Sequence, residues 1–379
     1  MNDLSVIADR LNINIEYVDE NKNYPVFLGK IKDKRICIVS DKNTRVFALD
    51  IAKNIEENGG LVFHANFDEE ELIPDEHAYG EVEKVARSNN ANYILAVGSG
   101  SINDICKYVS TKLDIPCGVL ATACSMDGYV SKGSALIKNK FKVTESVHTP
   151  SDVLINPNIL VTAPKIMTAA GFGDIMGKYT CLNDWRLSHI INGETINVEA
   201  FELMEKARDD CWNSFEELLS YDKVAIEKLM NALVVAGLSM AICGNSRPAS
   251  GGEHHMSHFL EMDFISRGEK VPPHGVKVAI GTLISIEIYN YIKEHRICFE
   301  HANEVYKLCE FLPKSDVLMQ RLKQIGCPVR FSEIGVREET MIEMLNKAYT
   351  VRDRYTILTL VHDLGLTEEL VPVIMEKFY

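Results

Sequence analysis

The sequence contains no CxxC pair and no regular cysteine framework, although ten of its 379 residues are cysteine. Several of them, such as Cys106 and Cys181, lie among apolar residues, where a free thiol packs as a small hydrophobic side chain. This pattern excludes a disulfide-stapled secreted fold and favours a reducing compartment.

Long hydrophobic runs and an N-terminal leader are absent too. No run reaches the roughly 18 apolar residues that a membrane span requires. The first residues also lack the basic patch and following apolar stretch of a secretory signal. We therefore expect a cytoplasmic protein that does not associate with a membrane.

The chain has no excess of positive charge. It carries 54 Asp and Glu against 40 Lys and Arg, which gives a formal net charge of -14 at pH 7. Nucleic-acid-binding proteins normally present a basic face, so we expect no nucleic-acid partner. The acidity does not exclude a phosphorylated small molecule, because the N–H groups of a helix N-terminus bind phosphate locally.

The sequence does contain a regular alternation of short apolar runs and helical patterns in its first part. Buried strands are predicted at 35–41, 61–67, 93–98 and 117–122, and helices at 44–58, 76–89 and 102–112. Strand, helix and strand in repetition predict a parallel sheet covered by helices. Farther along only helical patterns continue, at 194–220, 223–243, 275–294, 299–312 and 315–326. We predict an α/β nucleotide-binding domain over 1–163 and an all-α domain over 164–379.

A glycine-containing turn, GSGSIND at 98–104, follows the third predicted strand and opens a helix. Glycines let the backbone approach a diphosphate closely, and the helix N-terminus supplies N–H groups. The third glycine of the GxGxxG fingerprint is missing, so a plain strand-to-helix turn is an equally good interpretation. A polar cluster after the next strand, at the edge where open α/β sheets bind ligands, favours a cofactor crevice. It consists of Thr122, Ser125, Asp127, Gly128 and Ser131.

A carboxylate and a group of histidines form the second candidate site. Asp174 lies in a glycine-containing segment, and His254, His255, His258 and His274 follow some eighty residues later. His254 and His258 are four residues apart and share one face of a helix, whereas His255 points off it. A carboxylate with two imidazoles is a common ligand set for Zn²⁺ or Fe²⁺. Capping and surface roles are the alternative, since spacing does not show that Asp174 reaches the histidines.

Five segments resemble those of the glycerol-1-phosphate dehydrogenases, in the superfamily of iron-type alcohol dehydrogenases, glycerol dehydrogenases and dehydroquinate synthases. They are GSGSIND (98–104), TACSMDGYVS (122–131), GFGDIMGKYTCLNDWRL (171–187), SRPASGGEHHMSH (246–258) and HGVKVAIGT (274–282). The resemblance implies a dehydroquinate synthase-like fold and a role in phospholipid metabolism. It also implies reversible, metal-assisted reduction of dihydroxyacetone phosphate to sn-glycerol-1-phosphate with NAD(P)H.

The resemblance further implies roles for single residues. The metal ligands would be Asp174, His254 and His274, with Zn²⁺ as first choice and Ni²⁺ or Fe²⁺ as alternatives. NAD(H) or NADP(H) would be bound at Asp41, Gly98, Ser99, Gly100, Ser101, Ile102, Thr122, Ser125 and Ser131. Asp127, Asp174 and His258 would contact the substrate, and Asp127 or His258 would pass a proton to solvent.

Arg247 is a weaker candidate for the substrate phosphate, because a guanidinium can bind two phosphate oxygens. A structural salt bridge is the equally good alternative. The resemblance also predicts a homo-oligomer, a dimer or larger.

Three other functions stay open. A glycerol dehydrogenase, or a related dehydrogenase for another polyol, phosphorylated or phosphonate carbonyl, would use the same metal and cofactor residues. A dehydroquinate synthase-like lyase would carry more Lys and Arg around its phosphate site. A non-catalytic nucleotide-binding protein would not require the intact metal-ligand set.

Overall fold

The computed structural model describes residues 2–20, 23–69, 72–139 and 141–379. They fall into two compact units. Unit 1 contains the described residues up to Cys124 together with Gly128–Pro164, and unit 2 contains Ser125–Asp127 and Lys165–Tyr379. The sequence division at 163 assigns Ser125–Asp127 to the first half, whereas these residues pack with unit 2. Asp127 thereby joins the unit that carries Asp174 and the histidines.

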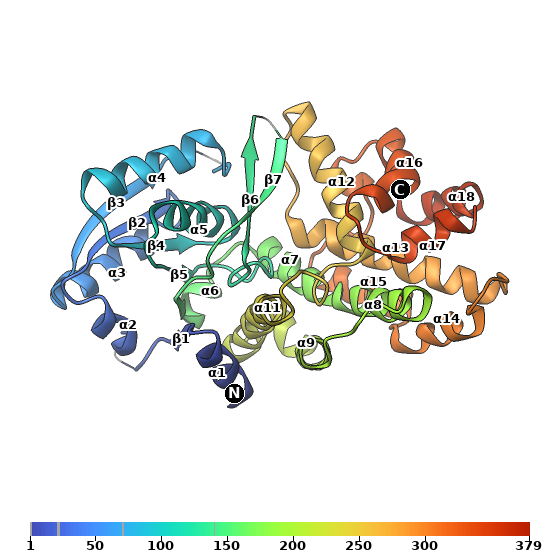
Figure 1. The fold of residues 1–379 in the computed structure, drawn as a ribbon, viewed down its shortest axis with the longest axis horizontal. Helices are drawn as coiled ribbons and strands as arrows, with labels where there is room; N and C mark the ends of the chain where they lie inside the picture. The colour runs from blue at the N-terminus through green and yellow to red at the C-terminus, as the bar shows by residue number, and fades with distance from the viewer. Residues whose placement is uncertain (1, 21–22, 70–71, 140) are drawn as a thin grey trace. The chain divides into compact units, whose positions relative to one another are not determined.

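Unit 1 is built on a six-stranded parallel sheet in the order β1-β8-β5-β4-β2-β3 (Figure 1). Its strands are β1 (Asn14–Tyr17), β2 (Arg35–Asp41), β3 (Leu61–Phe67), β4 (Tyr93–Gly98), β5 (Cys117–Ala121) and β8 (Asp152–Ile155). All residues of β4 and β5 are buried, as in the central strands of a parallel sheet covered on both faces. The predicted parallel sheet is confirmed. The apolar pattern does not predict the four-residue strands β1 and β8, because they are too short to show it.

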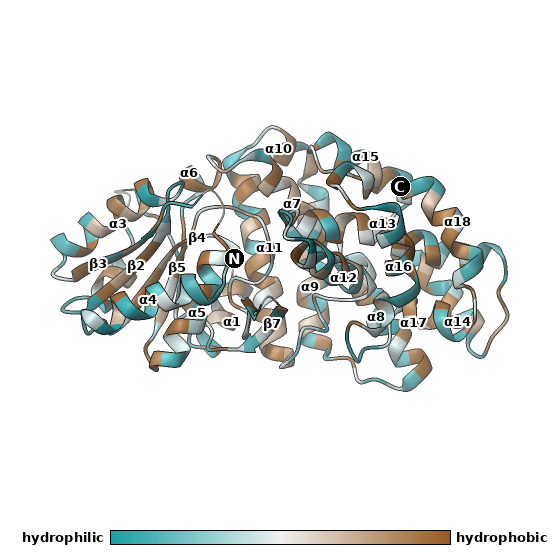
Figure 2. Cartoon of the chain, turned by 90° about the horizontal axis from the view of Figure 1, so that it is seen from above, coloured by the Kyte–Doolittle hydropathy of each residue, from teal (hydrophilic) through white to brown (hydrophobic). Residues whose placement is uncertain are grey.

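Helices α1 (Asn2–Arg10), α2 (Pro25–Lys30), α3 (Arg45–Glu57), α4 (Glu76–Ser88), α5 (Gly100–Leu113) and α6 (Pro157–Leu160) complete unit 1, with a hairpin of β6 (Gly133–Lys138) and β7 (Phe141–Ser146). A buried hydrophobic cluster packs α2 and α3 on the sheet and includes Phe27, Ile36, Ile38, Ile55 and Leu95. Figure 2 shows the hydrophobic colour along the central strands. This rigid core holds the carboxyl ends of β2, β4 and β5 in place.

The described part of unit 2 contains helices and no strand, which confirms the predicted helical second half. The helices are α7 (Lys165–Met176), α8 (Lys178–Asn192), α9 (Val198–Asn213), α10 (Phe215–Leu219), α11 (Lys223–Cys243), α12 (Gly252–Arg267), α13 (His274–Glu294), α14 (Ala302–Leu308), α15 (Ser315–Gln324), α16 (Glu338–Lys347), α17 (Ile357–Asp363) and α18 (Thr367–Phe378). The single helix predicted over 194–220 is two helices, α9 and α10, separated at Ser214.

Helix α11 is the one described helix that is long and apolar enough to cross a membrane by length and composition. Within the structure, 61% of its most apolar window is buried. It packs against α9 and α7. A helix that is hydrophobic on most sides and surrounded by other helices is typical of a protein core.

Helices α7 and α13 cross at two glycines, Gly173 and Gly275. A Cβ on Gly275 would overlap the backbone oxygen of Ala170, and one on Gly173 would lie 2.7 Å from the backbone oxygen of Gly275. Only glycine permits this approach without a shift of the backbone. Because Asp174 follows Gly173 and His274 precedes Gly275, the crossing brings a carboxylate and an imidazole together.

We predict that Gly275→Ala lowers the free energy of unfolding by about 1–3 kcal/mol, because the added methyl group forces the two helices apart. Thermal and denaturant unfolding of the purified protein measures this loss. Gly80→Ala in α4 is the matched control, since nothing lies within 4 Å of its added Cβ. The control should gain roughly 0.5–1 kcal/mol from the better helix propensity of alanine. Equal stability of Gly275→Ala and the wild type would contradict the close crossing.

Candidate active site

The carboxyl edge of the sheet in unit 1 carries most of the predicted cofactor residues. The neighbouring strands β2, β4 and β5 end at Asp41, Gly98 and Ala121. The Thr122 N–H donates to the Gly98 carbonyl at 3.2 Å, so the turns after β4 and β5 touch each other. Helix α5 begins at Gly100, within the glycine-containing segment, and the first N–H groups of a helix have no partner within the helix. The edge therefore presents the unpaired backbone N–H groups of a helix N-terminus beside the ends of two neighbouring strands.

Gly98 also has a packing role. A Cβ at this position would lie 2.5 Å from Ile102 Cδ1 and 2.8 Å from Ile102 Cβ. The absence of a side chain thus lets the first turn of α5 lie directly on β4. This is the strand-to-helix role that the sequence left open, and it is compatible with a nearby diphosphate.

Several predicted cofactor side chains contact other protein groups. Asp41 Oδ1 accepts hydrogen bonds from the backbone and hydroxyl of Thr44 at 2.8 and 3.1 Å. The Tyr129 hydroxyl donates to the Ala123 carbonyl at 2.6 Å and lies 3.1 Å from Ser99 Oγ. The hydroxyl of Ser131 donates to the Gly128 carbonyl at 3.1 Å. These contacts order the edge, and the cofactor roles of these residues, with those of Gly100, Ser101 and Ser125, stay predictions.

A buried lysine that sequence reasoning missed supports this edge. Lys107 is fully buried, and its Nζ donates to the carbonyls of Gly128 and Gly133 at 3.1 and 2.6 Å. It also pairs with Asp104 at 3.0 Å. A lysine among the apolar residues of the predicted helix 102–112 was the available signal. Lys107 fixes the loop from Gly128 to Gly133, which contains the end of the polar cluster after β5.

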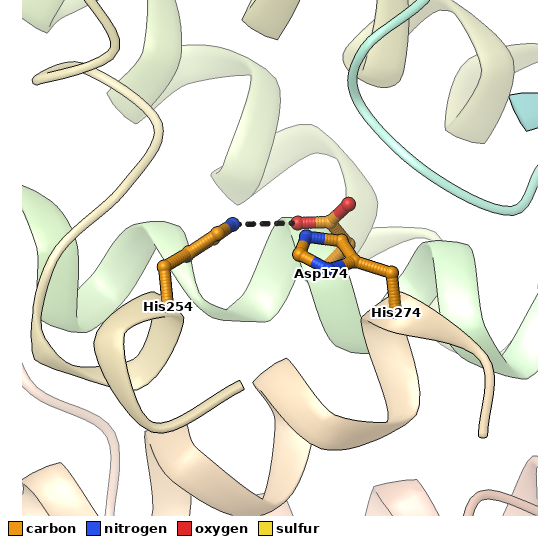
Figure 3. Close-up of side chains that lie close together, drawn as sticks. All are labelled: Asp174, His254 and His274. Carbon is orange, nitrogen blue, oxygen red and sulfur yellow. Dashed lines mark ion pairs between the residues drawn. The ribbon is translucent and has the colours of Figure 1, made fainter. Parts of the chain in front are cut away.

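In unit 2, Asp174, His254 and His274 lie together (Figure 3). One potential ligand atom from each lies within 4.8 Å of the other two. Asp174 belongs to α7, His254 to the first turn of α12, and His274 begins α13. His254 Nε2 is 3.6 Å from Asp174 Oδ1. The residues fit a divalent ion, because they offer a carboxylate and two imidazoles on a mostly buried wall.

The other two histidines of the group take different positions. The ring centroid of His258 lies 5.8 Å from that of His274 and 6.3 Å from that of His254, so His258 borders the three ligands. His255 is buried, and neither of its ring nitrogens has a hydrogen-bond partner in the described residues. Burial lowers the pKa of His255 to about 3, so this ring is neutral.

Glu253 orients His254. Its Oε1 accepts the His254 Nδ1 hydrogen at 2.7 Å and the Gly251 N–H at 2.6 Å. Its Oε2 accepts from the Thr180 hydroxyl at 2.8 Å. With the proton on Nδ1, the Nε2 lone pair of His254 is directed to a ligand position beside Asp174. Burial acts to lower the pKa of His254, but hydrogen bonds to Asp174 and Glu253 raise it overall.

Lys178 links two predicted substrate residues. It is fully buried, and its Nζ lies 2.6 Å from Asp127 Oδ2 and 2.9 Å from Asp174 Oδ1. The Asp127 N–H donates to Asp174 Oδ2 at 3.0 Å. Burial works against the charge of Lys178, but Asp127 and Asp174 raise its pKa above the usual range. Lys178 was also missed, although it follows Asp174 by only four residues, at the start of α8 directly after α7.

The surroundings shift the pKa values of Asp127 and Asp174 in opposite directions. Burial disfavours the ionised form of Asp174, but the Lys178 ammonium holds the pKa of Asp174 well below its usual range. Burial and the charge of Asp174 raise the pKa of Asp127.

Arg247 takes part in a salt bridge. Its Nη2 donates to Glu194 Oε2 and to the carbonyls of Asp184 and Tyr355, each at 2.9 Å. This salt bridge is the structural alternative to a phosphate contact. A phosphate contact of Arg247 stays a prediction.

Comparison with known proteins identifies similar chains. The family model described as iron-containing alcohol dehydrogenase matches residues 18–164. A glycerol-1-phosphate dehydrogenase (NAD(P)+) of Bacillus licheniformis is 33% identical over 347 residues, which cover 90% of this chain and 86% of the relative. The enzyme of the same description from Bacillus velezensis is 33% identical over 375 residues, covering 94% and 93%.

Solved structures share the fold at lower identity. Glycerol dehydrogenase from Schizosaccharomyces pombe superposes with a TM-score of 0.68 at 17% identity, covering 93% of this chain and 87% of the other. NADH-dependent butanol dehydrogenase A from Thermotoga maritima gives 0.69 at 16% identity, covering 96% and 97%.

We predict that Lys178→Met destabilises the metal-free protein strongly, by roughly 3–5 kcal/mol, because it leaves two buried carboxylates without their cation. Calorimetric unfolding in the presence of a chelator measures the loss. Added Zn²⁺ should recover part of it, since the ion would supply positive charge at Asp174. Lys347→Met is the control, because Lys347 is exposed and pairs with Glu343 within α16. A loss no larger than that of the control would show that Lys178 does not balance the carboxylates.

We predict that Glu253→Gln lowers the affinity for a divalent metal about 10- to 100-fold, because the imidazole of His254 loses its carboxylate acceptor. Competition with a chromophoric chelator measures this affinity. The exposed Glu339→Gln in α16 serves as control and should leave it unchanged. Equal affinities for the two variants would exclude a positioning role for Glu253.

Proposed function

The chain belongs to the glycerol-1-phosphate dehydrogenase family, and from this premise we propose that it reversibly reduces dihydroxyacetone phosphate to sn-glycerol-1-phosphate with NAD(P)H. The observation that best supports this proposal is the cluster of Asp174, His254 and His274, with the ammonium of Lys178 at 2.9 Å from Asp174. It supplies potential metal ligands and a charged, proton-carrying group in one buried place.

The ion held by Asp174, His254 and His274, Zn²⁺ as first choice with Ni²⁺ or Fe²⁺ as alternatives, would act as a Lewis acid on the substrate oxygen. The residues around the ion would orient its ligands and keep them in the required protonation state. Glu253 holds the His254 ring in the tautomer that leaves Nε2 free. Lys178 keeps Asp174 ionised, which a metal ligand requires.

Reduction of a ketone takes up one hydride and one proton. Asp127 is a candidate for the proton step, because burial and Asp174 raise its pKa and its carboxylate contacts the Lys178 ammonium at 2.6 Å. His258 is the second candidate, since an imidazole exchanges protons near neutral pH and its ring borders the ligands. Both residues would also contact the substrate.

The cofactor would be bound by unit 1. We assign its diphosphate to the turn from Gly98 to Ile102 and the N-terminus of α5, with Thr122, Ser125 and Ser131 beside it and Asp41 toward the adenosine. Hydride transfer itself is the chemistry of the nicotinamide. All ten cysteines are free thiols, which supports the proposal of a cytoplasmic protein. A homo-oligomeric state is proposed from the family resemblance.

The test is NAD(P)H oxidation by the metal-loaded protein with dihydroxyacetone phosphate and, in parallel, with dihydroxyacetone. We expect turnover of the phosphate, loss of turnover on chelation, recovery on addition of metal, and sn-glycerol-1-phosphate on chiral analysis. The His274→Ala variant should lose at least about 1,000-fold in turnover, since it removes one of three metal ligands. Turnover of dihydroxyacetone in preference to its phosphate would instead place the chain among the polyol dehydrogenases.

A further inference from the structure

Two arginines near the C-terminal end of the chain converge on one hydroxyl group in unit 2. Arg352 Nη1 and Arg354 Nη2 both contact Ser246 Oγ, at 3.1 and 3.0 Å. Arg354 Nη1 also donates to the Ser250 carbonyl at 2.5 Å. Ser246 and Ser250 lie in the segment that leads from α11 into α12, the helix of His254. Two guanidinium groups thus lie close together beside the candidate metal ligands.

No carboxylate of the described residues forms an ion pair with either guanidinium, although the charge of Glu194 raises the pKa of Arg354 from a distance. In the described ranges of the chain, no carboxylate lies within 4.0 Å of a guanidinium nitrogen of Arg352 or Arg354, and the nearby Arg247 takes Glu194. Burial lowers the pKa of Arg354 to about 10 and also that of Arg352. Two partly buried cations at close range repel each other, and an anion between them would relieve the repulsion.

Buried donors without acceptors surround the pair. Nε and Nη1 of Arg247 and the hydroxyl of Ser250 are buried and have no hydrogen-bond partner in the described residues. Buried polar groups are normally satisfied, so unmatched donors indicate a missing acceptor. Arg247, Arg352 and Arg354 also line a cavity of about 800 Å³ within unit 2. The space and the donors together suit an oxyanion.

Arg352 connects this place to the candidate metal ligands. Its Nη2 lies 3.3 Å from His258 Nε2, and the His258 ring centroid lies 5.8 Å from that of His274. The guanidinium is therefore separated from the ligands by a single side chain. A short substrate with a carbonyl at one end and an anionic group at the other would engage both.

We propose that Arg352, Arg354 and Ser246 form the subsite that receives the phosphate of the substrate and selects a phosphorylated over an unphosphorylated ketone. The inference rests on the proposed function. Guanidinium groups bind phosphate oxygens in pairs, and the Ser246 hydroxyl can donate a further hydrogen bond. Arg247 is held by Glu194, and its Nε and Nη1 have no hydrogen-bond partner in the described residues.

The test compares kcat/KM for dihydroxyacetone phosphate with that for dihydroxyacetone in the metal-loaded protein. Arg352→Met should lower the preference for the phosphate about 10- to 150-fold, the range expected for one lost charge-assisted contact. Arg352→Lys should recover part of the preference, because it restores the charge without the paired donors. The exposed Arg330→Met is the control and should keep the wild-type preference.

A second measurement does not depend on turnover. Inorganic phosphate, with a chelator present to exclude binding to metal, should raise the Tm of the wild type and of Arg330→Met, but not that of Arg352→Met. Arg354→Met is the less suitable variant, since Arg354 also holds the Ser250 carbonyl and its loss can destabilise the protein.

The outcomes separate the two ideas. Equal losses for both ketones in Arg352→Met, with the phosphate effect on Tm retained, would overturn the subsite and leave the proposed function standing. A wild type that does not prefer the phosphate, yet shows an Arg352-dependent shift of Tm, would overturn the proposed function and retain an anion site. Loss of both the preference and the Tm shift in Arg352→Met alone supports the subsite.

Discussion

The buried carboxylate of Asp174 is the constraint around which unit 2 is arranged. An ionised carboxyl group without water costs several kcal/mol unless nearby groups balance it. Here the balance comes from the Lys178 ammonium, the Asp127 N–H and the imidazole of His254. Asp127 and His254 come from distant parts of the chain, so unit 2 must bring these parts together for the carboxylate to stay charged once it is buried.

The helix crossing makes this arrangement possible. Gly173 and Gly275 let α7 and α13 approach until backbone touches backbone, which sets Asp174 beside His274. A second buried acid fixes α12 on the other side. Asp184 accepts hydrogen bonds from the Gly252 N–H at 2.7 Å and the Tyr289 hydroxyl at 2.7 Å. Burial and the charge of Glu253 raise the pKa of Asp184 to about 7. Holding α12 in this way therefore requires burying an acid whose ionised form is disfavoured.

The sequence predicts what depends on local pattern and misses what depends on long-range approach. Continuous apolar runs predicted β2, β3, β4 and β5, whereas β1 and β8 are too short to show one. Helical spacing pairs His254 with His258, but the structure groups His254 with His274, as the family resemblance implies and spacing alone does not. Lys178 was visible only as a charge four residues after Asp174. Arg352 and Arg354 flank an exposed Asp353, and in the sequence this run is typical of a solvated charge cluster. Only the structure shows that both arginines contact Ser246.

The distribution of charge explains why an acidic chain needs such a subsite. With a net charge of -14, the average field repels a phosphate, and binding must rely on local groups withdrawn from screening. Arginines partly removed from water and lacking a carboxylate are costly in the free protein and become favourable once an oxyanion is bound. The binding energy of the phosphate is then realised away from the carbonyl. Binding free energy gained at the phosphate, which does not react, can orient the reacting carbon. An unphosphorylated ketone lacks this source of binding free energy.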